Sequence, residues 1–258
     1  MYVVNSYKSI DMEKRFRNKK VFISGSSSGI GLQIAKTFSQ KGCKVGLNGV
    51  NKLRLKKAQD SIINSELFNY DVFEDRELGK LRKKVKQKFN KLDFLICNVG
   101  KSNFDLNHKD IKYAFNANFF SAVNLISFLG DLIKPNGRII CISSICGLEY
   151  LDGAPYGYSI AKSALNSYVK CFSRMYAKKK ITLNAIAPGN IMFKNSVWEK
   201  KLKKNKIKTN NYIKKNVPLE RFGQATEIAD LCFYLCSDEA SYINGSIIPI
   251  DGGQTGNF

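Results

Sequence analysis

The stretch Val21-Phe22-Ile23-Ser24-Gly25-Ser26-Ser27-Ser28-Gly29-Ile30-Gly31 decides how this chain folds. It begins as a short apolar strand, breaks into a loop of serines and glycines, and then enters apolar residues at helical spacing. A strand that turns through glycines onto a helix presents free backbone N–H groups and the positive end of the helix dipole, and both favour an anion. The stretch therefore predicts a phosphate site, although a serine-rich surface loop alone would look similar.

The glycines of this stretch have separate roles in that prediction. Gly25 permits the tight turn, Gly29 lets the backbone approach the ligand, and Gly31 lets the helix pack closely on the strand. Their Gly-x-x-x-Gly-x-Gly spacing differs from the Gly-x-Gly-x-x-Gly pattern of the best-known dinucleotide fingerprint. Support for a nucleotide site must therefore come from the rest of the chain.

Strand and helix patterns alternate along the remaining sequence. The alternation predicts a single α/β domain with a Rossmann-type, doubly wound parallel sheet of about seven strands and helices on both faces. In such a sheet, ligands bind at the carboxyl ends of the strands. Strands are expected at 20–24, 44–48, 67–70, 92–97, 138–142, 181–186 and 246–250. Helices are expected from 30 to 41 and at 52–64, 74–90, 109–133, 156–178 and 225–236.

Composition describes an ordinary globular protein with an unusual charge. The chain has 258 residues, 44% hydrophobic and 24% charged, with a formal net charge of +21. We expect a polar extension at 1–18 and one catalytic domain at 19–258. Its lysines are spread without a recognised nucleic-acid module, which makes a nucleic-acid partner the less favoured explanation of the charge.

The numbers of cysteines and histidines indicate the redox state of the compartment and bear on whether a metal site is expected. Seven cysteines without paired spacing, mostly inside apolar runs, indicate free thiols in the cytoplasm. One histidine in the whole chain gives little basis for a metal site, and we expect none. No apolar run approaches the length of a membrane span, so no membrane partner is expected.

Tyr158 and Lys162 form the candidate catalytic pair. They lie four residues apart near the start of a predicted helix, which puts both on one face. A lysine ammonium stabilises a phenolate and lowers the pKa of the phenol toward neutrality, so Tyr158 would serve as a general acid or base. Alone, the pair is equally typical of a surface helix. Ser143 and Ser144, at the end of the preceding strand, could hydrogen-bond a substrate oxygen.

These features occur in an order that resembles the short-chain dehydrogenase/reductase family over residues 19–254. The resemblance rests on the glycine loop, on Asn98-Val99-Gly100, Asn118, Ser143-Ser144, Tyr158-x-x-x-Lys162, Pro188-Gly189, 218–223 and 251–253. It implies an NAD(P)-dependent oxidoreductase in which a hydride passes between nicotinamide and a carbonyl or alcohol. Tyr158 would donate or accept the proton, Lys162 would lower its pKa and hold the ribose, and Ser144 would orient the substrate oxygen. Asn118 would hold a relay water.

The same resemblance implies a set of cofactor contacts. They are Gly25, Ser27, Ser28, Gly29, Ile30, Gly31, Asp71, Val72, Asn98, Val99, Gly100, Tyr158, Lys162, Pro188, Gly189 and Ile191.

The chain departs from the family pattern in three places, one of which is Cys97-Asn98-Val99-Gly100 where the family usually has Asn-Asn-Ala-Gly. The separation of Ser144 and Tyr158 is fourteen, one more than is usual in the family, which leaves Ser143 as a rival for the serine role. Phe193 stands where many relatives carry a threonine that holds the nicotinamide carboxamide.

The end of the second strand bears on the choice of cofactor. An acidic residue there would bind the ribose hydroxyls of NAD, whereas this chain has Gly49 and Val50. Lys52 and Arg54 follow closely and could reach an added phosphate, as could Ser26 or Ser27. We therefore favour NADP(H) over NAD(H).

Residues 190–216 occupy the place of the family's substrate lid and carry the single tryptophan, Trp198, with a dense run of lysines. A mobile basic loop would look the same, but a lid over an anionic substrate is the sharper interpretation.

The chain resembles reductases of surface-polysaccharide or flagellin-sugar pathways, with an activated sugar as substrate, and also 3-oxoacyl-carrier-protein reductases. A dinucleotide-binding regulator with a basic nucleic-acid surface is the non-enzymatic alternative.

Relatives are commonly homotetramers or homodimers built through the two long helices, where Val123, Ile126, Tyr168 and Phe172 would serve as interface or core.

Overall fold

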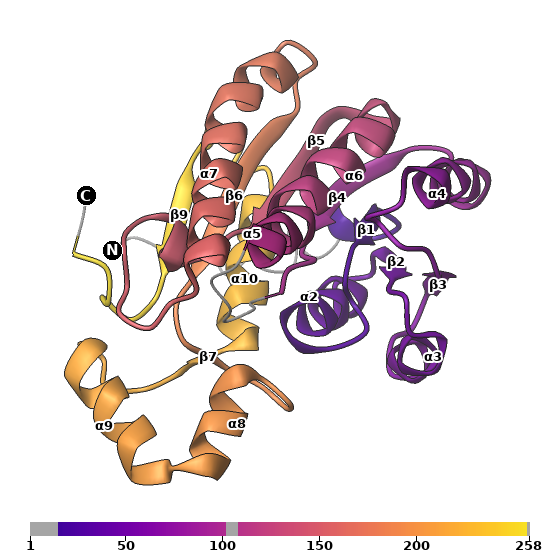
Figure 1. The fold of residues 1–258 in the computed structure, drawn as a ribbon. Coiled ribbons are helices and arrows are strands. Elements are labelled where there is room, and N and C mark those ends of the chain that lie inside the picture. Colours follow the sequence, from indigo (N-terminus) through magenta and orange to yellow (C-terminus); the bar gives the residue numbers. More distant parts are fainter. Residues whose placement is uncertain (1–14, 102–107, 257–258) are drawn as a thin grey trace, which may run out of the picture.

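The computed structural model describes residues 15–101 and 108–256, and within them seven parallel strands form one sheet (Figure 1). The spatial order is β3-β2-β1-β4-β5-β6-β9, so the direction of winding reverses between β1 and β4. This is the doubly wound arrangement that the sequence predicts. The strands are β1 (Lys20–Ile23), β2 (Lys44–Asn48), β3 (Ser65–Phe68), β4 (Leu92–Cys97), β5 (Ile133–Ile142), β6 (Thr182–Pro188) and β9 (Ile247–Ile250).

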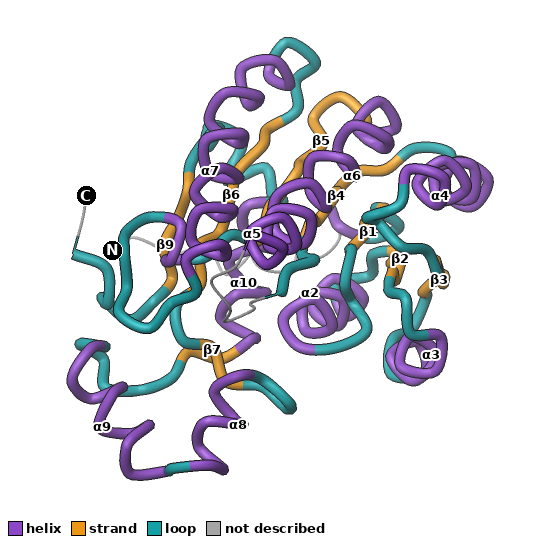
Figure 2. Tube along the Cα trace, viewed as in Figure 1, coloured by secondary structure: helices purple, strands orange, loops and turns teal. Residues whose placement is uncertain are grey.

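Helices cover both faces of the sheet (Figure 2). One face packs against α2 (Gly29–Gln40), α3 (Lys52–Asp60) and α10 (Ala225–Leu235). The other packs against α4 (Asp75–Phe89), α6 (Ser121–Leu129) and α7 (Tyr156–Ala177). Because both faces are covered, the central strands are buried throughout and read as continuous apolar runs in the sequence.

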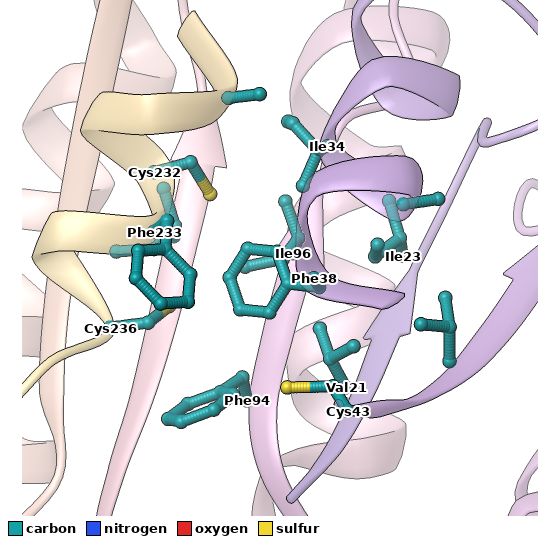
Figure 3. Close-up of a cluster of buried hydrophobic side chains, with 14 of the residues drawn as sticks. Val21, Ile23, Ile34, Phe38, Cys43, Phe94, Ile96, Cys232, Phe233 and Cys236 are labelled. Atoms are coloured by element: carbon teal, nitrogen blue, oxygen red, sulfur yellow. The ribbon is translucent and has the colours of Figure 1, made fainter. Parts of the chain in front are cut away.

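The core between α2 and α10 contains a residue from the predicted N-terminal extension. Phe16 is buried, and its ring centroid lies 4.1 Å from that of Phe233 and 5.5 Å from that of Phe94. Figure 3 shows Phe233 and Phe94 in this cluster beside Phe38 and Cys43. Phe16 therefore packs with the domain although it comes from the expected polar extension, and burial of a side chain of this kind stabilises a fold by roughly 1.5–3 kcal/mol. Residues 1–14 lie outside the described residues.

The helical region expected at 109–133 is interrupted. It consists of α5 (His108–Phe115), a π-helical turn at Asn116–Phe120, α6, and a short 3₁₀ turn that leads into β5. β5 also begins five residues earlier than expected, since a register shift opposite Leu92 and Phe94 accommodates the segment around Pro135 within the strand. β3 lies two residues earlier than the 67–70 expected.

The predicted lid forms two helices below the carboxyl edge of the sheet, α8 (Val197–Lys204) and α9 (Lys206–Asn216) (Figure 1). A two-stranded ladder of β7 (Ile191–Met192) and β8 (Gly223–Gln224), which the sequence pattern did not reveal, anchors the ends of this segment. Among the helices of the described residues, none combines the length and the hydropathy that a membrane span requires.

Candidate active site

A cavity of about 1080 Å³ opens at the carboxyl ends of the strands and extends under the lid. All but two of the sequence-predicted site residues line it. The exceptions are Gly31 and Asn118, which lie directly behind its wall. Those in the lining are Gly25, Ser27, Ser28, Gly29, Ile30, Asp71, Val72, Asn98, Val99, Gly100, Ser144, Tyr158, Lys162, Pro188, Gly189 and Ile191.

The glycine loop joins β1 to α2 in a shape that side chains would block. Gly25 has a φ of +62°, a left-handed conformation that glycine adopts without strain. A Cβ at Gly31 would lie 2.6 Å from the Gly25 carbonyl oxygen and closer still to the Asn98 amide. The first turn of the helix therefore packs against the end of the strand only because residue 31 has no side chain.

Asn98 links this loop to the end of β4. Its Nδ2 donates to the carbonyl oxygens of Ser24 and Gly25, at 3.1 Å each, and its backbone N–H donates to the Ser24 hydroxyl at 3.0 Å. These bonds use the amide N–H groups of the side chain, so Asn98 holds the loop in shape at the wall of the cavity that it also lines.

The loop fits the pyrophosphate of a dinucleotide. Ser28 is the N-cap of α2, yet its side chain accepts no hydrogen bond from the first turn. The first backbone N–H groups of the helix therefore face the cavity together with the positive end of its dipole, next to the glycine cradle that a Cβ would fill.

The end of β2 lacks the carboxylate that would bind ribose hydroxyls. Asn48 donates to the carbonyl oxygens of Phe68 and Tyr70, at 2.9 Å each, and so ties β2 to the chain after β3. Gly49 lies against Ser27, and Arg54 lines the cavity without an acidic partner among the described residues. The Arg54 guanidinium and the Ser27 hydroxyl at this point suit a phosphate group better than the two hydroxyls of an unphosphorylated ribose.

Tyr158, Ser144 and Lys162 converge in the middle of the cavity. The Ser144 hydroxyl is near enough to the Tyr158 phenol to influence its pKa, and the Lys162 Nζ lies 5.9 Å from the Tyr158 ring centroid. Lys162 is buried and donates to the Ile142 carbonyl oxygen at 2.7 Å. Ser143 instead donates to the Asn166 Oδ1 at 2.6 Å. Of the two rival serines, Ser144 is thus the one beside the tyrosine.

The charge states of the pair differ from the expectation drawn from spacing. Burial raises the pKa of Tyr158 to about 12, and the Ser144 hydroxyl only partly opposes this. Burial also lowers the pKa of Lys162 to about 8, against the opposite influence of the nearby Cys141, Cys146 and Cys97 thiols. The pKa of Tyr158 is therefore raised and not lowered as the spacing predicts, because desolvation is the largest influence on it. At neutral pH Tyr158 carries its proton.

Asn118 lies in the π-helical turn and is fully buried. Its Nδ2 donates to the carbonyl oxygens of Lys101 and Ala114, and the Lys101 N–H donates to its Oδ1 at 2.9 Å. A Cβ at Gly100 would lie 2.9 Å from this Oδ1 and 3.4 Å from the Lys162 Nζ, so the amide and the ammonium share one neighbourhood. Single-turn π-helices of this kind are frequent at functional sites.

The sequence analysis did not assign Cys146 or Tyr212 to the site, and it named Phe193 only as a departure from the family pattern. Cys146 follows Ser144 and donates its backbone N–H to the serine hydroxyl at 3.2 Å. Phe193 covers Gly29, where a Cβ would lie 2.7 Å from the ring. Tyr212 reaches the cavity from α9 and carried no recognisable motif. The folding of the lid onto the strand ends brings Phe193 and Tyr212 to the site.

A doubly wound sheet with a glycine cradle at its switch point and a Ser–Tyr–Lys set beside it defines an NAD(P)-dependent oxidoreductase. A family model described as enoyl-(acyl carrier protein) reductase matches residues 25–255. The chain belongs to this family, the short-chain dehydrogenases/reductases.

Individual relatives extend over nearly the whole chain. The 3-oxoacyl-[acyl-carrier-protein] reductase of Buchnera aphidicola is 32% identical over 90% of this chain and 96% of its own. The enzyme of the same name from Thermotoga maritima is 29% identical over 93% and 98%. The crystal structure of L-sorbose reductase from Gluconobacter frateurii, complexed with NADPH and L-sorbose, superposes with a TM-score of 0.87. It is 26% identical and is matched over 94% of this chain and 98% of that one.

Proposed function

We propose that this enzyme reduces a carbonyl substrate with NADPH, and that Tyr158 donates the proton. The observation that carries the proposal is the Tyr158 phenol, protonated at neutral pH, in the cavity beside Ser144 and one helical turn from the buried Lys162. A protonated phenol is the form that a reductase needs, because the carbonyl oxygen must gain a proton as the carbon is reduced.

The protein's contribution is position and proton supply. A bound nicotinamide dinucleotide supplies the hydride. Ser144 and Tyr158 converge on the place where a substrate oxygen would lie, so both hydroxyls polarise it before transfer. Lys162, fixed by the Ile142 carbonyl, holds positive charge where a phenolate would form. Asn118 fixes the Lys101 backbone beside Lys162 and completes the wall of the site.

NADP(H) is the proposed cofactor. Support comes from the absence of a carboxylate between Asn48 and Arg54 and from the Arg54 side chain in the cavity wall. The NADPH bound to the related L-sorbose reductase agrees with this choice.

The proposed substrate is an activated sugar, with a 3-oxoacyl-carrier-protein thioester as the second candidate. Similarity to L-sorbose reductase supports a sugar carbonyl. The relatives that are 29–32% identical support the acyl substrate. Both candidates carry phosphate groups, and the many lysines of the lid suit either of them.

The phenylalanine variant Tyr158→Phe tests the proposal. We expect a loss of about 10²–10⁴ in kcat with carbonyl substrates, the usual contribution of a positioned acid, while NADPH affinity measured by fluorescence stays unchanged. Tyr156→Phe is the matched control, since Tyr156 is half-exposed in the same helix and does not line the cavity. Wild-type turnover by Tyr158→Phe would remove Tyr158 from the mechanism. Failure of the wild-type protein to bind NADPH or NADH would overturn the enzymatic proposal.

A further inference from the structure

We propose that Lys201, Lys204 and Lys208 form a phosphate-binding subsite for the substrate within the lid. The inference rests on the proposed function and deepens it by naming the substrate class, a carbonyl compound that carries phosphate groups remote from the reacting carbon. All three lysines line the cavity that also contains Tyr158 and Lys162, so one ligand could contact both regions.

The break between the two lid helices brings these lysines to one wall. α8 ends at Lys204, and Asn205 leaves helical geometry with φ of −155° and ψ of 93° before α9 begins. The Asn205 Oδ1 then accepts the Lys208 N–H at 2.9 Å and caps the second helix. The end of one helix and the start of the next therefore face the same space.

The charges on this wall are not neutralised by the protein. Lys203, a neighbour in sequence, pairs with Glu199 at 3.4 Å and lies outside the cavity lining. Lys201, Lys204 and Lys208 have no acidic partner within 4.0 Å among the residues that the structure describes. Two acids, Asp71 and Asp152, also line the cavity, and they are fewer than the three lysines.

Trp198 gives the subsite a rigid floor and a reporter. Its ring stacks on Tyr212 with centroids 5.3 Å apart, and the Lys201 Nζ lies 4.4 Å above it. Partial desolvation lowers the pKa of Lys201, and an anion beside it would favour the charged form. Since Trp198 is the single tryptophan of the chain, its fluorescence reports directly on this place.

The phosphates of the cofactor are the competing ligand for these lysines, and the experiment must exclude them. We would first titrate the full-length protein with NADP⁺ and then work at saturation, so that the cofactor's phosphate sites are filled. Trp198 fluorescence would then be followed during titration with inorganic pyrophosphate, with coenzyme A and with UDP. Pantetheine, which lacks phosphate, serves as the neutral probe.

The variant K201A/K204A/K208A carries the test, and K200A/K206A/K214A is its matched control. The control removes the same charge from exposed lysines of the same segment that do not line the cavity. Circular dichroism checks that both variants keep their helices. We expect saturable quenching by the phosphate probes in the wild type and the control. In K201A/K204A/K208A the affinity for these probes should fall at least about tenfold, as the loss of three exposed ion pairs predicts. Added salt should weaken the wild-type response.

The outcomes separate this inference from the function on which it rests. Equal binding to both triple variants, a response to pantetheine equal to that to coenzyme A, or no response of the NADP⁺-loaded wild type would overturn the subsite while the reductase stands. Failure of NADP⁺ to bind would overturn the proposed function and the subsite with it. Tighter binding of coenzyme A than of UDP would identify the phosphate source as a phosphopantetheine thioester, and the reverse order a nucleotide-activated sugar.

Discussion

At the scale of single residues, the site is governed by burial more than by the spacing of its charges. Tyr158 and Lys162 are four residues apart in sequence. Desolvation nevertheless raises the pKa of Tyr158 and lowers that of Lys162, and both shifts favour the neutral form of the group. A protonated phenol and a lysine that titrates near 8 suit proton donation to a carbonyl. The reverse reaction would need a phenolate, which this environment disfavours.

Lys162 makes the stability of the protein depend on pH in a defined direction. Its pKa is about 8 when folded and 10.5 as an ordinary lysine, so the unfolded chain binds more protons between these values. The free energy of unfolding should therefore gain with rising pH across that interval, and the full cost of burying the cation is present below about pH 8.

We expect Lys162→Met to remove this dependence. Urea unfolding at about pH 7 and about pH 9.5 should show the stability of the wild type increasing relative to the variant as the pH rises. The control Lys170→Met removes an exposed lysine from the same helix and should keep a constant difference from the wild type. A difference that is constant for Lys162→Met as well would contradict the lowered pKa.

Gly49 is expected to select the cofactor, because it leaves the end of β2 without a carboxylate. Gly49→Asp should weaken NADPH binding by about tenfold, or about 1.4 kcal/mol, and leave NADH binding equal or stronger. The new Cβ would lie 3.2 Å from the Ser27 Oγ, which a small rotation of that serine can relieve. Gly79→Asp, in α4 with open space around it, is the control of equal charge. An unchanged ratio of NADPH to NADH affinity in Gly49→Asp would show that another residue determines the cofactor preference.

At the scale of elements, the π-helical turn between α5 and α6 is the feature that sequence periodicity missed. A helical pattern predicts that apolar residues face the core, but it does not reveal one extra residue per turn. Here Asn118 occupies the interior of the turn and bonds the chain after β4, so two elements that are distant in sequence depend on one amide.

Asn118→Ala should destabilise the protein by about 1–3 kcal/mol, because it removes the side-chain amide that donates to the Lys101 and Ala114 carbonyls from a buried position. It should also reduce kcat through displacement of the wall beside Lys162. Asn116→Ala, an exposed position in the same turn, should change neither quantity. Chemical unfolding and steady-state kinetics measure the two effects, and equal behaviour of the two variants would refute the role of the turn.

At the scale of the whole molecule, the expected interface along α7 remains a proposal. Ile126, one of the residues named for it, is fully buried and belongs to the core. Phe172 is 38% exposed and stacks on Tyr168 with centroids 4.1 Å apart, which leaves an aromatic surface beside α5. Exposed aromatic clusters of this kind are typical of contacts between subunits.

Phe172→Glu should convert a homotetramer or homodimer into a smaller species, because a carboxylate in an apolar interface would be desolvated without a partner. Light scattering coupled to size exclusion measures the mass. Ile63→Glu, at an exposed apolar position in the loop after α3, is the control that should keep the wild-type mass. A monomeric wild type, or an unchanged mass for Phe172→Glu, would contradict an interface at this face.

The sequence by itself determined the alternation of strands and helices, the glycine loop and the catalytic set, because these depend on local periodicity and on short motifs. It predicted β4 to the residue and the whole of α7 with one residue in excess. Tertiary structure decided what depends on contacts between distant segments. The packing of Phe16 in the core, the choice of Ser144 over Ser143 beside Tyr158, and the meeting of three lid lysines with the cavity are such contacts. The pKa values also belong to this second group, because desolvation depends on everything that surrounds a side chain, and no local pattern records that.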